Sequence, residues 1–221
     1  MKTAMIGIIL AAAIAAQGET AKLLAKVDGH DIGSVVYKTD FAADHSWIES
    51  FVSTLEINGH RFENSTTVHF SADGKALEDD EKETVDGQVS ENQTIKFHDK
   101  TATVTDALSG ETSTFTAPDD PPTLDPSDSW FVISKPKIGD KAVASSFSSE
   151  EKWHTTTVTY VEDRSFKLGD QTIPGHLLRH QHPKDSYEEI VDDHGLPLQV
   201  DLPASNGAPA LRFVRSPYTD I

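Results

Sequence analysis

Cysteine is absent from this sequence, and its absence removes several kinds of chemistry at once. No disulfide can cross-link the chain, no thiol can act as a nucleophile or metal ligand, and no leader peptide can end in a lipidated cysteine. The chain therefore has to be held together by its core. With 221 residues it is long enough for one domain or two closely associated halves.

Basic residues are also scarce. The sequence has 19 Lys and Arg residues against 36 Asp and Glu residues, which gives a formal net charge of −17 at pH 7. A chain with this charge repels nucleic acids and anionic lipid head groups, so neither is expected as a partner. The acidic residues are spread along the chain, as is typical of a solvated surface.

Long apolar runs are missing after the first twenty residues. Lys2 precedes an apolar stretch from Thr3 to Ala16, and small residues follow at possible cleavage positions. This layout predicts a signal peptide over residues 1–18, because the stretch is short for a membrane span; a buried core helix is the alternative. We therefore expect an exported protein, periplasmic or extracellular, that does not span a membrane.

Helical periodicity is hard to find after residue 18, whereas alternation of apolar and polar residues is frequent. Thr, Val, Ile and aromatic residues dominate the alternating segments, as half-buried strands favour. Asn-Gly and Asp-Gly pairs, which suit tight hairpin turns, separate many of them. The segments expected as strands are 35–41, 47–57, 65–71, 93–98, 101–108, 154–162, 187–191 and 196–202. They predict an all-β fold, either a long antiparallel meander curled into a half-barrel or two linked β-halves.

One segment interrupts the strands. APDDPPTLDPSDSW, residues 117–130, contains four prolines, which remove backbone donors and exclude a central strand. We expect residues 117–129 to connect two halves of a single β domain (19–221), one half over 19–116 and the other over 130–221. Asp125 and Pro126 resemble a helix N-cap and first helical residue, so one short helix is predicted near residues 126–133.

Histidines gather near the C-terminal end, in GHLLRHQHPKDSYEEIVDDHG. On a strand, His180 and His182 would share a face, and a three-residue loop would place Glu188 opposite His180. These three side chains are the candidate ligands of a divalent metal ion. The alternative is an ordinary pair of strands with cross-strand ion pairs, among them Arg179 with Glu189.

Motifs of common enzymes are not found. The sequence has no Gly-x-Ser-x-Gly, no His-Glu-x-x-His, no phosphate-binding glycine loop and no dinucleotide fingerprint. Catalytic residues cannot be selected among the many Asp, Glu, Ser and His residues. The sequence therefore favours a protein that is not an enzyme, and apart from the candidate metal it predicts no cofactor.

Four segments carry a resemblance. They are GHDIGSVVY (Gly29–Tyr37), KPKIGDKAV (Lys135–Val143), LGDQTIPGHLLRH (Leu168–His180) and YEEIVDDHGLPLQVDL (Tyr187–Leu202). Together they resemble an uncharacterised family of bacterial envelope β-proteins, which is distantly similar to the half-barrel carriers of lipids and lipoproteins in the periplasm. The resemblance implies a strongly curved antiparallel sheet with an apolar concave side and a helix or loop as a lid. It transfers no functional residues.

The leading functional hypothesis is a non-enzymatic envelope protein that binds a lipid or other amphipathic small molecule in a concave sheet. One alternative is a secreted hydrolase that depends on a metal or on carboxylates, which the histidines and acidic residues would serve. Another is an interaction scaffold that offers an edge strand to a protein partner.

Overall fold

The computed structural model describes residues 18–117, 127–148, 152–182, 186–204 and 209–217, and these residues form fourteen strands and one helix. In chain order the elements are β1 (Glu19–Val27), β2 (His30–Phe41), β3 (Trp47–Ile57), β4 (His60–Phe70), β5 (Ala76–Val85), β6 (Gln88–His98), β7 (Thr101–Asp106), β8 (Thr112–Thr116), α1 (Ser127–Ser134), β9 (Lys141–Ser148), β10 (Lys152–Leu168), β11 (Gln171–Gln181), β12 (Ser186–Val191), β13 (Pro197–Leu202) and β14 (Leu211–Arg215).

All of these strands belong to one antiparallel sheet with the order β8-β7-β6-β5-β4-β3-β2-β1-β14-β13-β12-β11-β10-β9. Each strand pairs with its neighbour in the chain except β8 and β9, which lie at the two edges of the sheet. In addition β1 pairs with β14, which places Leu24 opposite Val214. That pairing joins the N-terminal and C-terminal runs of strands into a continuous sheet. The predicted all-β meander is confirmed, and its two halves are parts of the same sheet.

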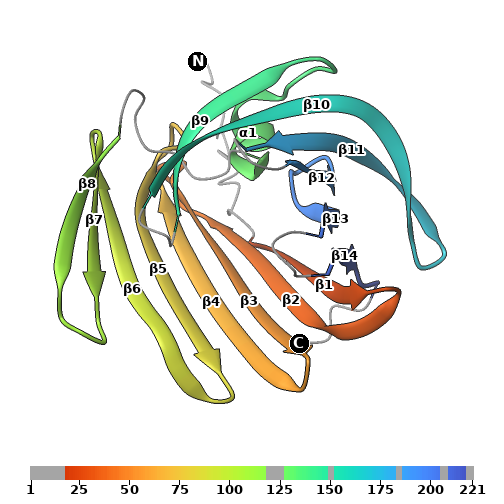
Figure 1. Ribbon diagram of the computed structural model, residues 1–221. Helices are drawn as coiled ribbons and strands as arrows, with labels where there is room; N and C mark the ends of the chain where they lie inside the picture. Colours follow the sequence, from red (N-terminus) through yellow and green to blue (C-terminus); the bar gives the residue numbers. More distant parts are fainter. Residues whose placement is uncertain (1–17, 118–126, 149–151, 183–185, 205–208, 218–221) are drawn as a thin grey trace, which may run out of the picture.

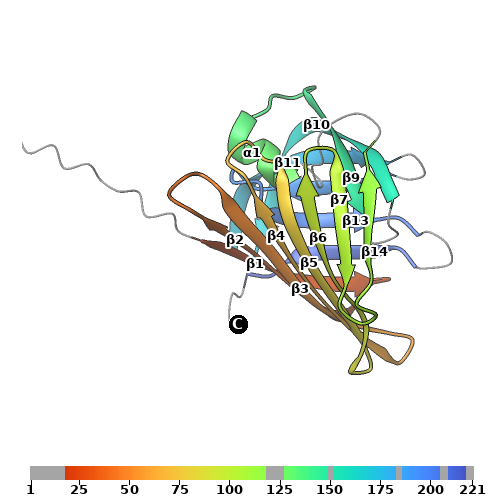
Figure 2. The same cartoon turned by 90° about the vertical axis from the view of Figure 1, so that its left-hand side faces the viewer.

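The sheet curls round on itself without closing. Figure 1 shows β1 to β8 along one side of the molecule and β9 to β14 arching over the other, and Figure 2 shows the same curl from the side. β8 and β9 form the two edges of the sheet and are not hydrogen-bonded neighbours. They meet through aromatic side chains instead, since the ring centroids of Phe115 and Phe147 lie 5.3 Å apart.

The helix α1 lies within the curve of the sheet, next to β10 and β11 (Figure 1). Its Phe131 packs in a buried cluster with Val158, Tyr160, Leu178 and Val191. We call the face of the sheet that carries this cluster the inner face, and the opposite one the outer face. The short helix predicted near residues 126–133 is confirmed as Ser127–Ser134, whereas the predicted N-cap and residues 118–126 of the connector lie outside the described residues.

Cross-strand partners extend the inner face from β11 to β6. From Leu178 it runs through Glu189, Val200 and Phe213 to Ala25. Since residues two or four apart on a strand share a face, it continues from Ala21 on β1. From Ala21 the inner face passes through one residue on each of β2 to β6, namely Tyr37, Phe51, Thr66, Glu81 and Gln93.

Tight turns set the register of the N-terminal hairpins, as the Asp-Gly and Asn-Gly pairs predict. Asp28, Asn58 and Asp86 have φ angles of 49°, 55° and 52°, and each is followed by a glycine with positive φ. Two successive positive φ values define the turn type that matches the twist of a strand pair.

A close approach between strands explains a further glycine. Gly33 on β2 has a φ of 149°, and a Cβ atom added there would lie 1.9 Å from the backbone oxygen of Thr54 on β3. The second glycine of the GHDIG segment is therefore required by backbone packing.

Candidate functional site

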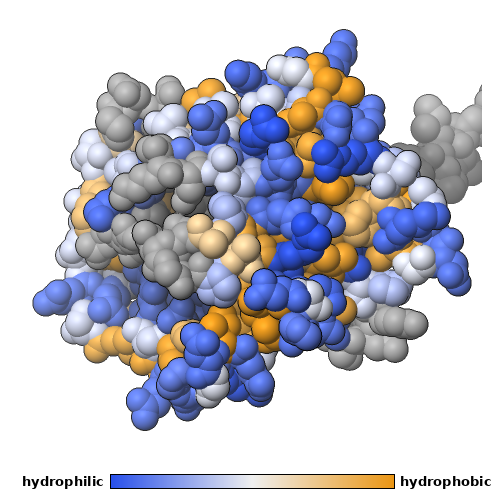
Figure 3. Space-filling view, turned by 45° about the vertical axis from the view of Figure 1, so that its right-hand side comes forward, coloured by the Kyte–Doolittle hydropathy of each residue, from blue (hydrophilic) through white to orange (hydrophobic). Residues whose placement is uncertain are grey.

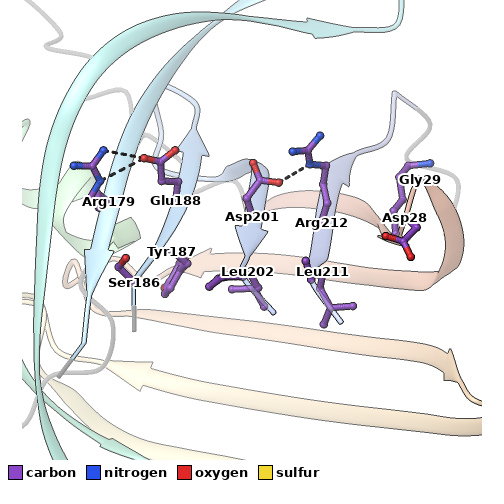
Figure 4. Close-up of a pocket in the computed structure, with 13 residues that line it drawn as sticks. Asp28, Gly29, Arg179, Ser186, Tyr187, Glu188, Asp201, Leu202, Leu211 and Arg212 are labelled. Atoms are coloured by element: carbon purple, nitrogen blue, oxygen red, sulfur yellow. Dashed lines mark hydrogen bonds and ion pairs between the residues drawn. The ribbon is translucent and has the colours of Figure 1, made fainter. Parts of the chain in front are cut away.

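A pocket of about 660 Å³ lies where the ends of β12, β13 and β14 meet the turn between β1 and β2. Its described lining combines charged and apolar residues. They are Lys26, Asp28, Gly29, Arg179, Ser186, Tyr187, Glu188, Asp201, Leu202, Pro203, Ala210, Leu211 and Arg212 (Figure 4). The two kinds of side chain occupy different parts of the wall.

The charged part of the wall is a row of side chains at matched positions on five neighbouring strands. Cross-strand partners run from Arg179 to Glu188, Asp201, Arg212 and Lys26. In Figure 4 the first four of these side chains point to the same side of the strands. They form two ion pairs, Arg179 with Glu188 at 3.0 Å and Arg212 with Asp201. Along the row, one positive charge is followed by two negative charges and then by two positive charges.

These ion pairs are partly exposed, which limits what they contribute to the fold. The side chains of Arg179 and Glu188 are 54% and 41% exposed, and those of Arg212 and Asp201 are 59% and 36% exposed. Pairs in such surroundings stabilise a protein by about 0–1 kcal/mol each. The charged groups can therefore exchange partners with a ligand at small cost.

The apolar part of the wall comes from neighbouring positions on the same strands. Leu202 and Leu211 lie opposite each other on β13 and β14, and Tyr187 is on β12. Figure 4 shows these three side chains on the opposite side of the strands from the row of charges. Because side chains of both kinds line the same pocket around the strand ends, one molecule bound there can contact a charged group and an apolar group.

The predicted register of the histidine hairpin is wrong by one residue. His180 lies opposite Tyr187, and Arg179 pairs with Glu188 instead of Glu189. The pairing starts at Gln181 and Ser186, so the connection spans four residues instead of three. Because side chains alternate along a strand, Glu188 points away from the face that carries His180.

The histidines themselves lie as predicted in one respect, because His180 and His182 share a face. The ring of Tyr187 stacks on both, with centroid distances of 4.3 Å to His180 and 5.8 Å to His182. Nε2 of His180 lies 2.9 Å from Oε2 of Glu189, and both side chains are buried. The buried pair supports the ring of Tyr187 at the pocket wall.

Another histidine, His176, contacts the helix α1. Nδ1 of His176 lies 2.9 Å from Asp163, and its Nε2 lies 2.7 Å from Asp193. The ring of Phe131 on α1 packs on it with a centroid distance of 5.2 Å. Burial, followed by the hydrogen bond that its hydroxyl donates to Asp163, raises the pKa of the neighbouring Tyr160. This cluster fixes α1 to the inner face.

No group of three or more His, Asp or Glu side chains in the described ranges could hold one metal ion. Within the same ranges, no helix is long and apolar enough to cross a membrane.

Sequence reasoning did not select the pocket. Its strand residues come from β1, β11, β12, β13 and β14. Three of these strands, β1, β11 and β14, were not among the segments expected as strands, although the candidate metal site assumed a strand around His180. A signal is present in LPLQVDL and LRFVR, where Asp201 and Arg212 alternate with apolar residues. The chain order gives no indication that the two segments pair with each other and with β1.

No protein-family model matches this sequence, and no curated protein matches it. Among solved structures, the chain is similar to the crystal structure of a β-barrel-like protein of the domain of unknown function DUF1849 from Brucella abortus. The TM-score is 0.68 at 14% identity, over 90% of this chain and 95% of that one. A DUF1089 family protein from Pseudomonas aeruginosa matches with a TM-score of 0.44 at 11% identity, over 74% of this chain and 87% of that one. The first match shows that the chain has a β-barrel-like fold.

Proposed function

We propose that this chain is an exported, non-enzymatic protein that binds an amphipathic small molecule in the pocket at the ends of β12, β13 and β14. The observation that carries the proposal is the division of the pocket wall. A row of partly exposed charges lines the pocket from one side of the strands, and the apolar side chains of Tyr187, Leu202 and Leu211 line it from the other side at the strand ends. Ligand pockets commonly combine an apolar lining with a few polar groups that orient the ligand.

The apolar part of the ligand would contact Leu202, Leu211 and Tyr187. All three side chains are only half-buried in the described structure, so a ligand can remove further apolar surface from water. That removal is favourable by about 25 cal/mol for each Å². Figure 3 shows hydrophobic residues in patches between hydrophilic ones on the face that is turned forward in that view.

The polar part of the ligand would contact the charged row. Arg212 and Lys26 are cross-strand neighbours of like charge, and so are Asp201 and Glu188. Like charges placed directly opposite each other on neighbouring strands are unfavourable. Each of these charges has an opposite partner, including Asp31 for Lys26. A charged ligand head group would exchange with one of these partly exposed pairs.

The proposal of export rests on residues 1–18. Lys2, the apolar stretch from Thr3 to Ala16 and the small residues after it have the order of a signal peptide. β1 begins at Glu19, directly after the expected cleavage region. The folded part would therefore keep its full sheet after removal of the leader.

A fluorescence-displacement titration with long-chain detergents below their critical micelle concentration tests the proposed function. Leu211→Asp places a charge in the apolar part of the wall, and we expect it to weaken binding at least tenfold, because about 1.5–3 kcal/mol of apolar burial is lost. Leu108→Asp is the matched control, since Leu108 is 54% exposed in the turn between β7 and β8. Equal affinities of both variants and the unchanged protein would contradict the proposal, and so would the absence of any displacement.

A further inference from the structure

Carboxylates face the interior of the curl on β5 and β6. Asp79 and Glu81 lie on the inner face of β5, where Asp79 is opposite Ile95 and Glu81 opposite Gln93. Glu91, on β6, lies two residues before Gln93 and so shares its face. These three acidic side chains and Gln93 form the cluster that we call the inner acidic site.

Most of this cluster is connected by one amide. Nε2 of Gln93 donates to Oε2 of Glu81 at 2.6 Å and to Oε1 of Glu91 at 2.7 Å. Both amide protons are thereby used, and two carboxylates are held close together. Burial, followed by the charge of Glu81, raises the pKa of Glu91, so the cluster is short of positive charge.

Asp79 lies deepest in the site. Its side chain is 2% exposed, and within the described residues its Oδ1 has no hydrogen-bond partner. A buried carboxylate oxygen without a donor is costly, and native proteins provide partners for most such atoms. Burial, then the neighbouring charge of Glu81 and a hydrogen bond between the two carboxyl groups, raise the pKa of Asp79 to about 8. The unpartnered oxygen therefore identifies a place for a hydrogen-bond donor with positive charge.

No basic side chain in the described part of the chain forms an ion pair with Asp79, Glu81 or Glu91. The lysines of these strands are on the outer face, where Lys96 pairs with Glu78 at 3.1 Å. The apolar neighbours of Asp79 are Val68 on β4 and Ile95 on β6, and both belong to the buried cluster that contains Trp47 and Phe97. The site thus has carboxylates over an apolar wall.

The spacing of the carboxylates indicates which kind of cation would fit the site. No three of them in the described structure could hold a single metal ion. Neighbouring strands are about 4.8 Å apart, and residues on one face repeat about every 7 Å along a strand. Positive charges that are separated by short methylene chains would match this spacing, and the methylene groups would contact the apolar wall.

We propose that the inner acidic site binds a linear polyamine, with ammonium groups donating hydrogen bonds to Asp79, Glu81 and Glu91. Glu81 and Glu91 are half-buried, so solvent reaches the cluster from their side while Asp79 lies at its closed end. This site is separate from the pocket at the strand ends and is proposed independently of it.

Isothermal titration calorimetry of the full chain with spermidine tests the proposal. We expect saturable binding that Asp79→Asn and Glu91→Gln each weaken about tenfold or more. Glu78→Gln is the matched control, because Glu78 lies on the outer face of the same strand, and it should bind as the unchanged protein does. Circular dichroism and thermal unfolding check that each variant is folded.

The number of protons exchanged gives a second readout that does not depend on affinity alone. An ammonium group favours the ionised form of Asp79, so spermidine should release protons at pH 7 when the titration is repeated in buffers of different ionisation enthalpy. The release should be smaller in Asp79→Asn. The proposal is overturned if spermidine does not saturate, if Glu78→Gln weakens binding as much as Glu91→Gln, or if Mg²⁺ at equal charge concentration produces the same heats.

Discussion

The burial of Asp79 differs from what the alternation of apolar and polar residues on β5 suggests. On β5 the apolar Leu77 is 47% exposed, while the acidic Asp79 is 2% exposed. Asp79 keeps the regular register of β4 and β5 and lies opposite Val68, whereas the shift after His69 pairs Phe70 with Ala76 and skips Leu77. A charged residue is therefore buried where the alternation of the sequence does not indicate it.

The stability of the protein should depend on pH through this carboxyl group. Its pKa is about 8 in the folded state, against 3.8 for an unperturbed Asp side chain. Between these values the folded state holds a proton that the unfolded state has lost, so stability falls as pH rises. Between the two pKa values the free energy of unfolding falls by about 1.4 kcal/mol per pH unit because of this group. Above the folded pKa the group causes no further loss of stability.

Asp79→Asn should remove that dependence. We expect the variant to gain stability relative to the unchanged protein as pH rises from about 4 to about 8, with little relative change above about 8.5. Urea unfolding at a series of pH values measures the difference. Asp99→Asn serves as the control, because the Asp99 side chain is 88% exposed. A difference between Asp79→Asn and the unchanged protein that stays constant with pH would show that Asp79 is ionised throughout.

Among the elements, α1 has a role that its length alone does not suggest. It has eight residues, too few to be stable in isolation, so its structure depends on packing against the sheet. Phe131 provides that packing through contacts with Tyr160 and His176, whose ring centroids lie 5.6 Å and 5.2 Å away.

Replacement of the packed ring should release the helix before the sheet. Phe131→Ala removes a buried aromatic side chain, a change that costs about 3–5 kcal/mol in a well-packed core. We expect hydrogen exchange of α1 to accelerate strongly while β1 and β14 keep their protection. Ile133→Ala on the same helix is the matched control, since Ile133 is 48% exposed and should have little effect. Equal acceleration in both variants would show that Phe131 does not anchor the helix.

At the scale of the whole molecule, local features could be predicted from sequence and distant pairings could not. The turns at Asp28, Asn58 and Asp86 set hairpins because their chemistry is contained in two adjacent residues. The pairing of β1 with β14 brings together the two ends of the described chain, and no local signal encodes it. This pairing makes the two halves one sheet.

The candidate site could be predicted only in part for the same reason. The cross-strand ion pair of Arg179 was expected, but with the wrong partner, because the connection between β11 and β12 is one residue longer than assumed. A shift of one residue exchanges the faces of a strand, so Tyr187 took the place expected for Glu188. The strand β5 was missed altogether, since ALEDDEKETV lacks the apolar residues that usually identify a strand.

Native mass spectrometry of the protein, purified from its own host without detergent, tests the central proposal of a ligand-binding pocket most directly. We expect an additional mass in the range of an amphipathic small molecule, lost on denaturation and absent from the Leu211→Asp variant. The Leu108→Asp control should retain it. A bare polypeptide mass for the unchanged protein, or a bound mass that persists in Leu211→Asp, would contradict the assignment of the pocket between β12, β13, β14 and the turn that follows β1.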